Sequence, residues 1–130
     1  MGRPGRSWQL AAGLAALAAS CSKSPATPDP GSTPPVQTTQ ITITAAGASP
    51  RNISIAQGAR VLFVNNDTRS HNMTSDPHPE HDDCPPINQV GFLKPGESRE
   101  TGNMVEIRTC GFHDHDNPAD NGLHGQIVTR

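Results

Sequence analysis

Apolar and polar residues alternate along three short stretches near the middle of the chain. These stretches are Ile41–Ile43, Ile53–Ile55 and Val61–Val64, and each is bounded by Gly, Pro, Asn or Asp. Alternation with a period of two places one side chain in the core and the next in solvent, which is typical of short β-strands. Further strands are expected at Val90–Leu93, Val105–Thr109 and Gln126–Val128.

Turn residues separate these stretches, and no apolar stripe with helical spacing and useful length occurs among them. The pattern favours an all-β fold, a Greek-key β-sandwich, over residues 41–130. Between Ser70 and Asn88 large apolar side chains are almost absent. We therefore expect a long loop there, and long ordered loops usually have a function.

The first 20 residues have the features of a bacterial export signal. Arg3 and Arg6 precede an apolar run, which is the arrangement found in signal peptides. The run is shorter than the roughly 20 apolar residues of a transmembrane helix, and it ends in small residues before Cys21. Because Ala18–Cys21 resembles a lipobox, residues 1–20 are expected to be a lipoprotein signal peptide, with lipidation at Cys21.

Residues 21–40 are rich in Pro, Ser and Thr, and Val36 is their only large apolar residue. Such a segment is expected to be an extended tether. The chain is thus predicted to be exported, to face the periplasm and to be lipid-anchored to a bacterial membrane. Ser22 rather than Asp follows the lipidated cysteine, which favours the outer membrane.

The amino-acid composition of the chain excludes some classes of function. The chain has 130 residues, with 10 Lys and Arg against 12 Asp and Glu, and only 3% of its residues are aromatic. Without a basic run or aromatic side chains for base stacking, nucleic acid is excluded as a partner. A domain of about 90 residues buries little apolar surface, so a disulfide or a metal ion is expected to stabilise it.

All six histidines lie in the second half of the chain: His71, His78, His81, His113, His115 and His124. Imidazole is a good ligand for copper, zinc and nickel. In an extended segment His113 and His115 point to the same side, and His78 and His81 lie three residues apart in a loop that contains prolines. The grouping predicts a metal site.

Two segments resemble the cupredoxins, a superfamily of copper proteins. From Gly47 to His71 the glycines, prolines and apolar residues follow the order of the family's first strands, and the final histidine matches its first copper ligand. Near the C-terminus, Cys110–His115 and Leu123–Val128 resemble the ligand loop and the last strand. The resemblance covers most of the expected domain and implies a plastocyanin-like fold that binds copper and takes part in electron transfer.

One interpretation of Cys110 gives a type 1 (blue) copper site. The resemblance then implies that His71, Cys110 and His113 bind the metal, and the protein is an electron carrier. Two observations argue against it: Leu123 stands where the family has its axial Met, and the periodicity of 105–109 predicts that Cys110 points away from the core.

The other interpretation pairs Cys110 with Cys84 in a disulfide. If Cys21 is lipidated, these two remain in an oxidising compartment, where free thiols are unusual. The disulfide would tie the His-bearing loop to the Cys110 strand and contribute about 3 kcal/mol. The metal site is then all-imidazole, and its expected ligands are His71, His113 and His115, with His78 or His81 added from the loop.

The sequence thus predicts an exported copper-binding protein that handles copper or transfers electrons, with zinc as the alternative metal. Its expected partners are the metal ion, the membrane and a periplasmic redox or copper-transfer protein. No catalytic residues are predicted. A third hypothesis is an enzyme, because Gly111–His115 resembles a segment of copper/zinc superoxide dismutase, but too little chain follows His115 for that family's remaining ligands.

Overall fold

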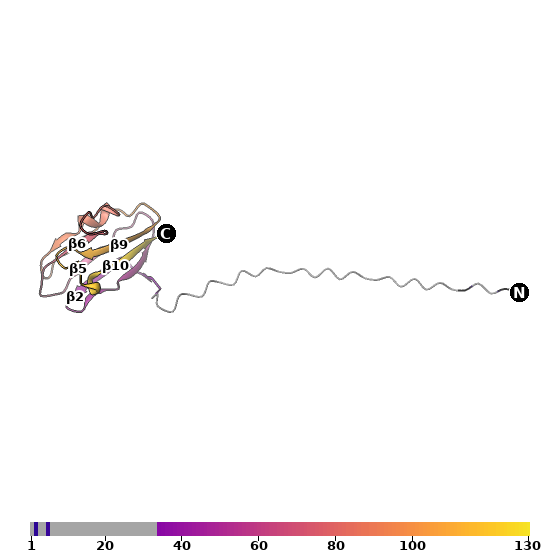
Figure 1. Ribbon diagram of the computed structural model, residues 1–130, viewed down its shortest axis with the longest axis horizontal. Helices are drawn as coiled ribbons and strands as arrows, with labels where there is room; N and C mark the ends of the chain where they lie inside the picture. The colour runs from indigo at the N-terminus through magenta and orange to yellow at the C-terminus, as the bar shows by residue number, and fades with distance from the viewer. Residues whose placement is uncertain (1, 3–4, 6–33) are drawn as a thin grey trace.

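The computed structural model describes residues 34–130 and the isolated residues 2 and 5. Its strands form two sheets that pack together (Figure 1). In spatial order the six-stranded sheet contains β1 (Val36–Gln37), β4 (Asn52–Ile55), β10 (Gly125–Thr129), β9 (Thr109–Asp114), β6 (His71–Ser75) and β7 (Gly91–Leu93). The four-stranded sheet contains β3 (Gly47–Ser49), β2 (Gln40–Thr44), β5 (Leu62–Asn65) and β8 (Ser98–Glu100). Two short 3-10 helices, η1 (Pro85–Gln89) and η2 (Asn121–Leu123), lie in the connections.

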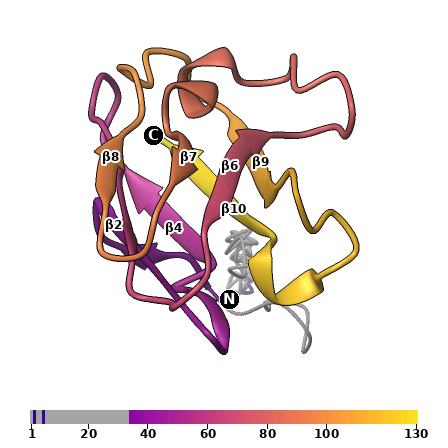
Figure 2. The same ribbon diagram turned by 90° about the vertical axis from the view of Figure 1, so that its left-hand side faces the viewer.

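Strands that are far apart in sequence are neighbours in both sheets. β2 pairs with β5 in parallel, and β4 pairs with β10 in parallel, so the chain crosses between the sheets rather than forming only hairpins. β6 and β9 pair in antiparallel register and lie side by side in Figure 2. The predicted all-β sandwich is confirmed.

The core lies between the two sheets. Ile41, Ile43 and Phe63 enter it from the four-stranded sheet, and Ile53 and Phe112 enter it from the other; all five are fully buried. The rings of Phe63 and Phe112 meet edge to face, with centroids 5.3 Å apart. Burial of such apolar side chains is the main favourable term in folding, and it fixes which face of each strand points inward.

Strand β9 begins later than the sequence pattern predicts. Val105 and Ile107 are 58% and 67% exposed and belong to no strand. Cys110 and Phe112 face the core. Because successive side chains of a strand point to opposite faces, His113, the residue after Phe112, faces the outer side of the sheet. The prediction that Cys110 points away from the core was wrong, because the residues that set the expected phase lie outside the strand.

The expected loop between Ser70 and Asn88 is shorter than predicted. Strand β6 covers its first part and η1 its last part, which leaves residues 76–84 as the loop. The alternation in β6 was not recognisable as apolar, because its buried positions are His71, Met73 and Ser75. Strands β3 and β8 were also missed, since they consist of small or exposed polar residues.

The N-terminal predictions are only partly within the described residues. Strand β1 lies inside the range predicted as a tether and pairs with β4. Cys21 and nearly all of the predicted signal peptide lie outside the described residues. Within the part that the structure describes, no helix has the length and apolar character that crossing a membrane requires.

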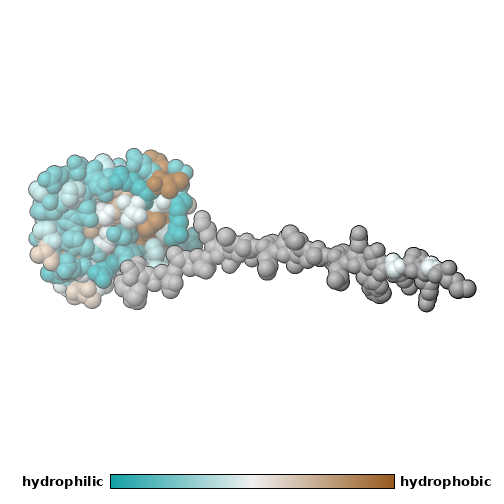
Figure 3. Space-filling model, turned by 45° about the vertical axis from the view of Figure 1, so that its right-hand side comes forward, coloured by the Kyte–Doolittle hydropathy of each residue, from teal (hydrophilic) through white to brown (hydrophobic). Residues whose placement is uncertain are grey.

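The face of the molecule in Figure 3 is mostly hydrophilic, with small hydrophobic patches.

Candidate metal centre

Three imidazoles meet at the outer face of the six-stranded sheet. His113 comes from β9, and His78 and His81 come from the 76–84 loop; one ring nitrogen of each lies within 4.8 Å of the others. The ring centroids of the three pairs are 4.9 to 5.5 Å apart. Because a metal–imidazole bond is about 2 Å long, two nitrogens on one ion lie at most about 4 Å apart, so the three rings would have to move closer together to share an ion.

The ring of His113 is buried and oriented for metal binding. Its Nδ1 lies 2.6 Å from Oδ1 of Asp76, so Nδ1–H donates to that carboxylate. Its Nε2 is buried and has no hydrogen-bond partner among the described residues. Burial lowers the pKa of His113, although the hydrogen bond to Asp76 acts in the opposite direction. The ring is therefore held neutral, with its Nε2 lone pair available.

His81 is oriented in a similar way. Its Nδ1–H donates to the backbone carbonyl of Ser75 over 2.8 Å, which leaves the lone pair on Nε2. That Nε2 accepts a hydrogen bond from Nδ1–H of His115, the first residue after β9, over 2.8 Å. A metal ion bound by both nitrogens would have to displace this proton, and His115 is then the candidate for a fourth ligand.

His124 lies against the cluster without joining it. Its ring stacks on that of His113, with centroids 5.6 Å apart and planes 27° apart. Its Nε2–H donates to the carbonyl of Pro118 over 2.8 Å. His124 therefore covers the buried ring of His113, and sequence analysis had not counted it among the ligands.

His71 is not part of the cluster. It lies on the same side of β6 as the core residue Met73, whereas the next position, Thr74, is paired with His113. The rings of His71 and His113 therefore lie on opposite faces of the sheet. The structure does not bring these two predicted ligands to a common ion.

Both ring nitrogens of His71 contact carboxylates. Nδ1 lies 2.7 Å from Oδ2 of Asp114, and Nε2 lies 3.0 Å from Oδ2 of Asp67. The hydrogen bond from His71 lowers the pKa of Asp67 to about 2. Burial raises the pKa of Asp114, but hydrogen bonds from His71, Asn72 and Asn117 hold it below its usual range. This buried network joins the turn before β6 to the end of β9.

The predicted disulfide between Cys84 and Cys110 is confirmed, with a Cα–Cα distance of 5.9 Å. Cys110 therefore has no thiolate to offer, and the type 1 site at His71, Cys110 and His113 is ruled out.

Sequence analysis also missed two residues that orient the histidine rings, Asp76 and Ser75. The sequence does hint at the first, because Asp76 precedes His78 in the same short loop.

Neither protein-family models nor curated proteins yield a match to this chain. Solved structures do match it. A purple cupredoxin from Nitrosopumilus maritimus is 21% identical, with a TM-score of 0.56 over 72% of this chain and 100% of that one. The oxidized plastocyanin of Dryopteris crassirhizoma is 15% identical, with a TM-score of 0.55 over 70% of this chain and 99% of that one. Auracyanin from Roseiflexus castenholzii is 14% identical, with a TM-score of 0.50 over 73% of this chain and 99% of that one.

Proposed function

We propose that this chain, which has the cupredoxin fold, binds one copper ion through His78, His81, His113 and His115. The observation that carries the proposal is the buried Nε2 of His113, which has no hydrogen-bond partner in the described structure. A buried polar atom without a partner is costly. Binding a cation at this nitrogen, beside the nitrogens of two other imidazoles, removes that cost.

The donor set fits Cu(II). Imidazole nitrogen is a good ligand for it, and Cu(II) binds most tightly in the series of divalent first-row metals. Among the described residues, the cluster contains no softer sulfur ligand of the kind that selects Cu(I). Cys84 and Cys110 form the disulfide, and Met73 and Met104 are buried in the core. Zinc also binds imidazole nitrogen and is the alternative metal.

The surrounding residues orient and shield the ligands. Asp76 and the carbonyl of Ser75 each fix a ring by accepting its Nδ1–H, an arrangement that orients the ring and increases the basicity of the other nitrogen. His124 covers His113, whereas His78 is exposed. A site that is buried on one side and open at His78 suits the uptake and release of an ion, so we favour copper handling.

A bound copper ion would also supply a one-electron couple, and electron transfer is the second candidate because plastocyanin shares the fold.

We further propose that the protein is exported and anchored through lipid on Cys21. The sequence pattern of residues 1–21 supports this proposal. Metabolic labelling with palmitate tests it, with Cys21→Ala as the control. Label in the wild type and none in the variant is expected, and an unlabelled wild type would contradict the anchor.

Copper titration of the purified chain tests the metal site. We expect one Cu(II) per chain by calorimetry, an EPR spectrum with nitrogen ligands and no intense blue colour. His113→Ala should abolish tight binding, whereas His71→Asn, checked for folding by circular dichroism, should retain it. Unchanged binding in His113→Ala would overturn the site, and an intense blue colour would reveal a thiolate ligand. Reversible oxidation and reduction of the bound copper would favour electron transfer over copper handling.

A further inference from the structure

The loop that carries His78 and His81 has few apolar contacts of its own. Among residues 76–84, Cys84 alone belongs to the hydrophobic core. The loop is otherwise held by hydrogen bonds. Asp76 N donates to the carbonyl of Gly111 over 3.1 Å, and in the middle of the loop His81 is bonded to Ser75, His115 and Asn88. Polar contacts of this kind each contribute little net stability, so the buried and covalently linked Cys84 is the strongest single attachment of the loop.

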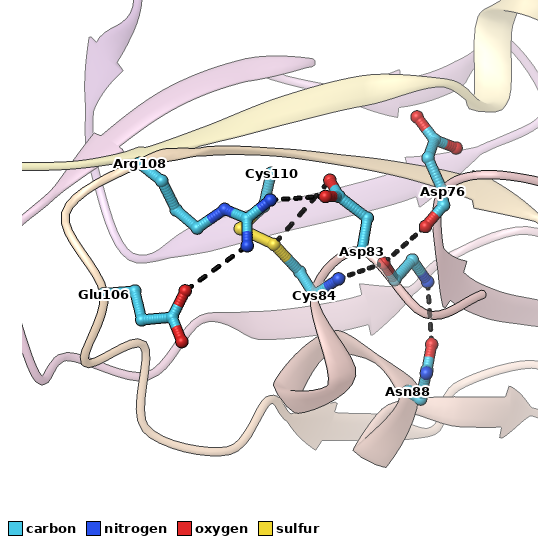
Figure 4. The surroundings of a disulfide bond; sticks show 8 residues. Asp76, Asp83, Cys84, Asn88, Glu106, Arg108 and Cys110 are labelled. Carbon is cyan, nitrogen blue, oxygen red and sulfur yellow. Dashed lines mark hydrogen bonds and ion pairs between the residues drawn. A yellow bond between two sulfur atoms is a disulfide. The ribbon is translucent and has the colours of Figure 1, made fainter.

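The disulfide links this loop to the strand that provides the buried ligand. Cys110 lies on β9 three residues before His113, so a single covalent bond connects the two segments that form the cluster. Figure 4 shows the polar contacts that surround the bond. Cys84 N donates to Oγ of Ser75 over 2.7 Å, and Asp83 pairs with Arg108 beside the sulfur atoms.

The sulfur atoms lie beneath the surface but next to an opening. Cys84 and Cys110 are 3% and 1% exposed, and both line a small cavity of about 70 Å³. Pro85, Met104 and the exposed residue Val105 form other parts of its wall. A small thiol that enters the cavity would meet the disulfide.

We propose that the Cys84–Cys110 disulfide controls the metal affinity of the histidine cluster, an inference that rests on the proposed copper-binding function. In the oxidised protein the bond holds His78 and His81 against His113. A dithiol reductant cleaves it by transferring two electrons and two protons: the S–S bond breaks, two cysteine thiols form, and the dithiol closes to its own disulfide. The loop is then free to move, and the ion must order it again in order to bind.

The thiols formed by reduction do not become metal ligands in place of the displaced histidines. Cys110 faces the core and His113 faces the outer side of the sheet, so the thiol of Cys110 points away from the imidazoles. Reduction therefore weakens the site without converting it into a thiolate site.

The test compares the oxidised wild type with the paired variant Cys84→Ala and Cys110→Ala. Alanine is chosen because both positions are buried. We expect the variant to bind Cu(II) 10- to 100-fold more weakly, the range seen when the residues that orient metal ligands are lost. The EPR spectrum of its bound copper should also change, which a general loss of stability would not cause. Ile43→Ala is the control, since it weakens the core in the opposite sheet and should leave the affinity unchanged.

The outcomes separate the two proposals. If the wild type binds Cu(II) and the paired variant binds it equally well with the same spectrum, the disulfide inference is overturned and the copper site stands. If the oxidised wild type binds no Cu(II), both fail. Should the variant not fold, the wild type is reduced anaerobically with dithiothreitol, desalted and titrated with Ni(II), which thiols do not reduce. A 10-fold or greater loss that reverses on reoxidation would support the inference, and an unchanged affinity would overturn it.

Discussion

Asp76 provides the sharpest test of the candidate site, because it contacts a ligand without being one. Its carboxylate accepts the Nδ1–H of His113 over 2.6 Å. We predict that Asp76→Asn lowers the Cu(II) affinity 10- to 100-fold, because the neutral amide no longer increases the basicity of Nε2. This loss corresponds to about 1.4 to 2.7 kcal/mol of binding free energy.

The effect on folding should be much smaller than the effect on binding. The Asp76 side chain is 41% exposed, and exposed ion pairs contribute about 0 to 1 kcal/mol to stability. Loss of the carboxylate also weakens proton binding by His113, whose pKa burial already lowers. At about pH 8, well above the ordinary imidazole pKa of about 6.5, that second effect is negligible and the loss of ligand basicity decides the result.

A second variant moves the carboxylate without changing its charge. A Cβ at Gly111 would overlap Oδ2 of Asp76 and lie 2.8 Å from its Cγ. Gly111→Ala should therefore displace the carboxylate from His113 and reproduce the weaker binding of Asp76→Asn. Asp82→Asn serves as the control, since it removes the same charge from an exposed position in the same loop.

Calorimetric titration with Cu(II) at about pH 8 measures the metal affinity of each variant, and urea unfolding in parallel measures its stability. The reasoning would be refuted if Asp76→Asn and Asp82→Asn weakened binding equally. Such a result would mean that the general negative charge of the loop, rather than the contact with His113, determines the affinity.

Further predictions concern stability. Replacing His71 by Ala leaves the Asp114 carboxylate buried without its ring partner, so urea unfolding should show a loss of about 3 kcal/mol; an unchanged midpoint would argue against a structural role. The pKa of Asp67 is about 2 in the folded protein against about 3.9 in an unfolded chain. Stability should therefore fall as the pH drops from about 5 to 2, and Asp67→Asn should flatten this dependence in urea titrations. Gly125→Ala places a methyl group against the backbone oxygen of Arg51 and the ring of Phe112 and should cost about 1–3 kcal/mol; thermal unfolding with an unaltered Tm would refute this close packing.

The sequence predicted the parts of the fold that rest on apolar alternation. Ile41 and Ile43, Ile53 and Ile55, and Phe63 are all buried on strands, as expected. Prediction failed where buried positions are polar, as in β6. It also failed before β9, where apolar residues are exposed because the chain has not yet entered the sheet.

The sequence predicted that histidines form the candidate site, but it did not predict which of the histidines come together. His78, His81, His113 and His115 lie in two clusters along the sequence, and the structure brings them together. His71 could not be separated from them by spacing. Its place is set by two carboxylates, of which Asp114 lies 43 residues away along the chain, and such long-range pairing has no local signal.

The two faces of strand β9 have different roles. Positions 110 and 112 are committed to the interior of the sandwich, and position 113, together with 115 just beyond the strand, is committed to the histidine cluster. Substitutions on the outer side thus leave the core residues in place, whereas position 110 also reaches the cluster through its disulfide. The choice of ligand, and with it the preference for a given cation, can diverge between descendants of this protein while the packing of the domain is inherited unchanged.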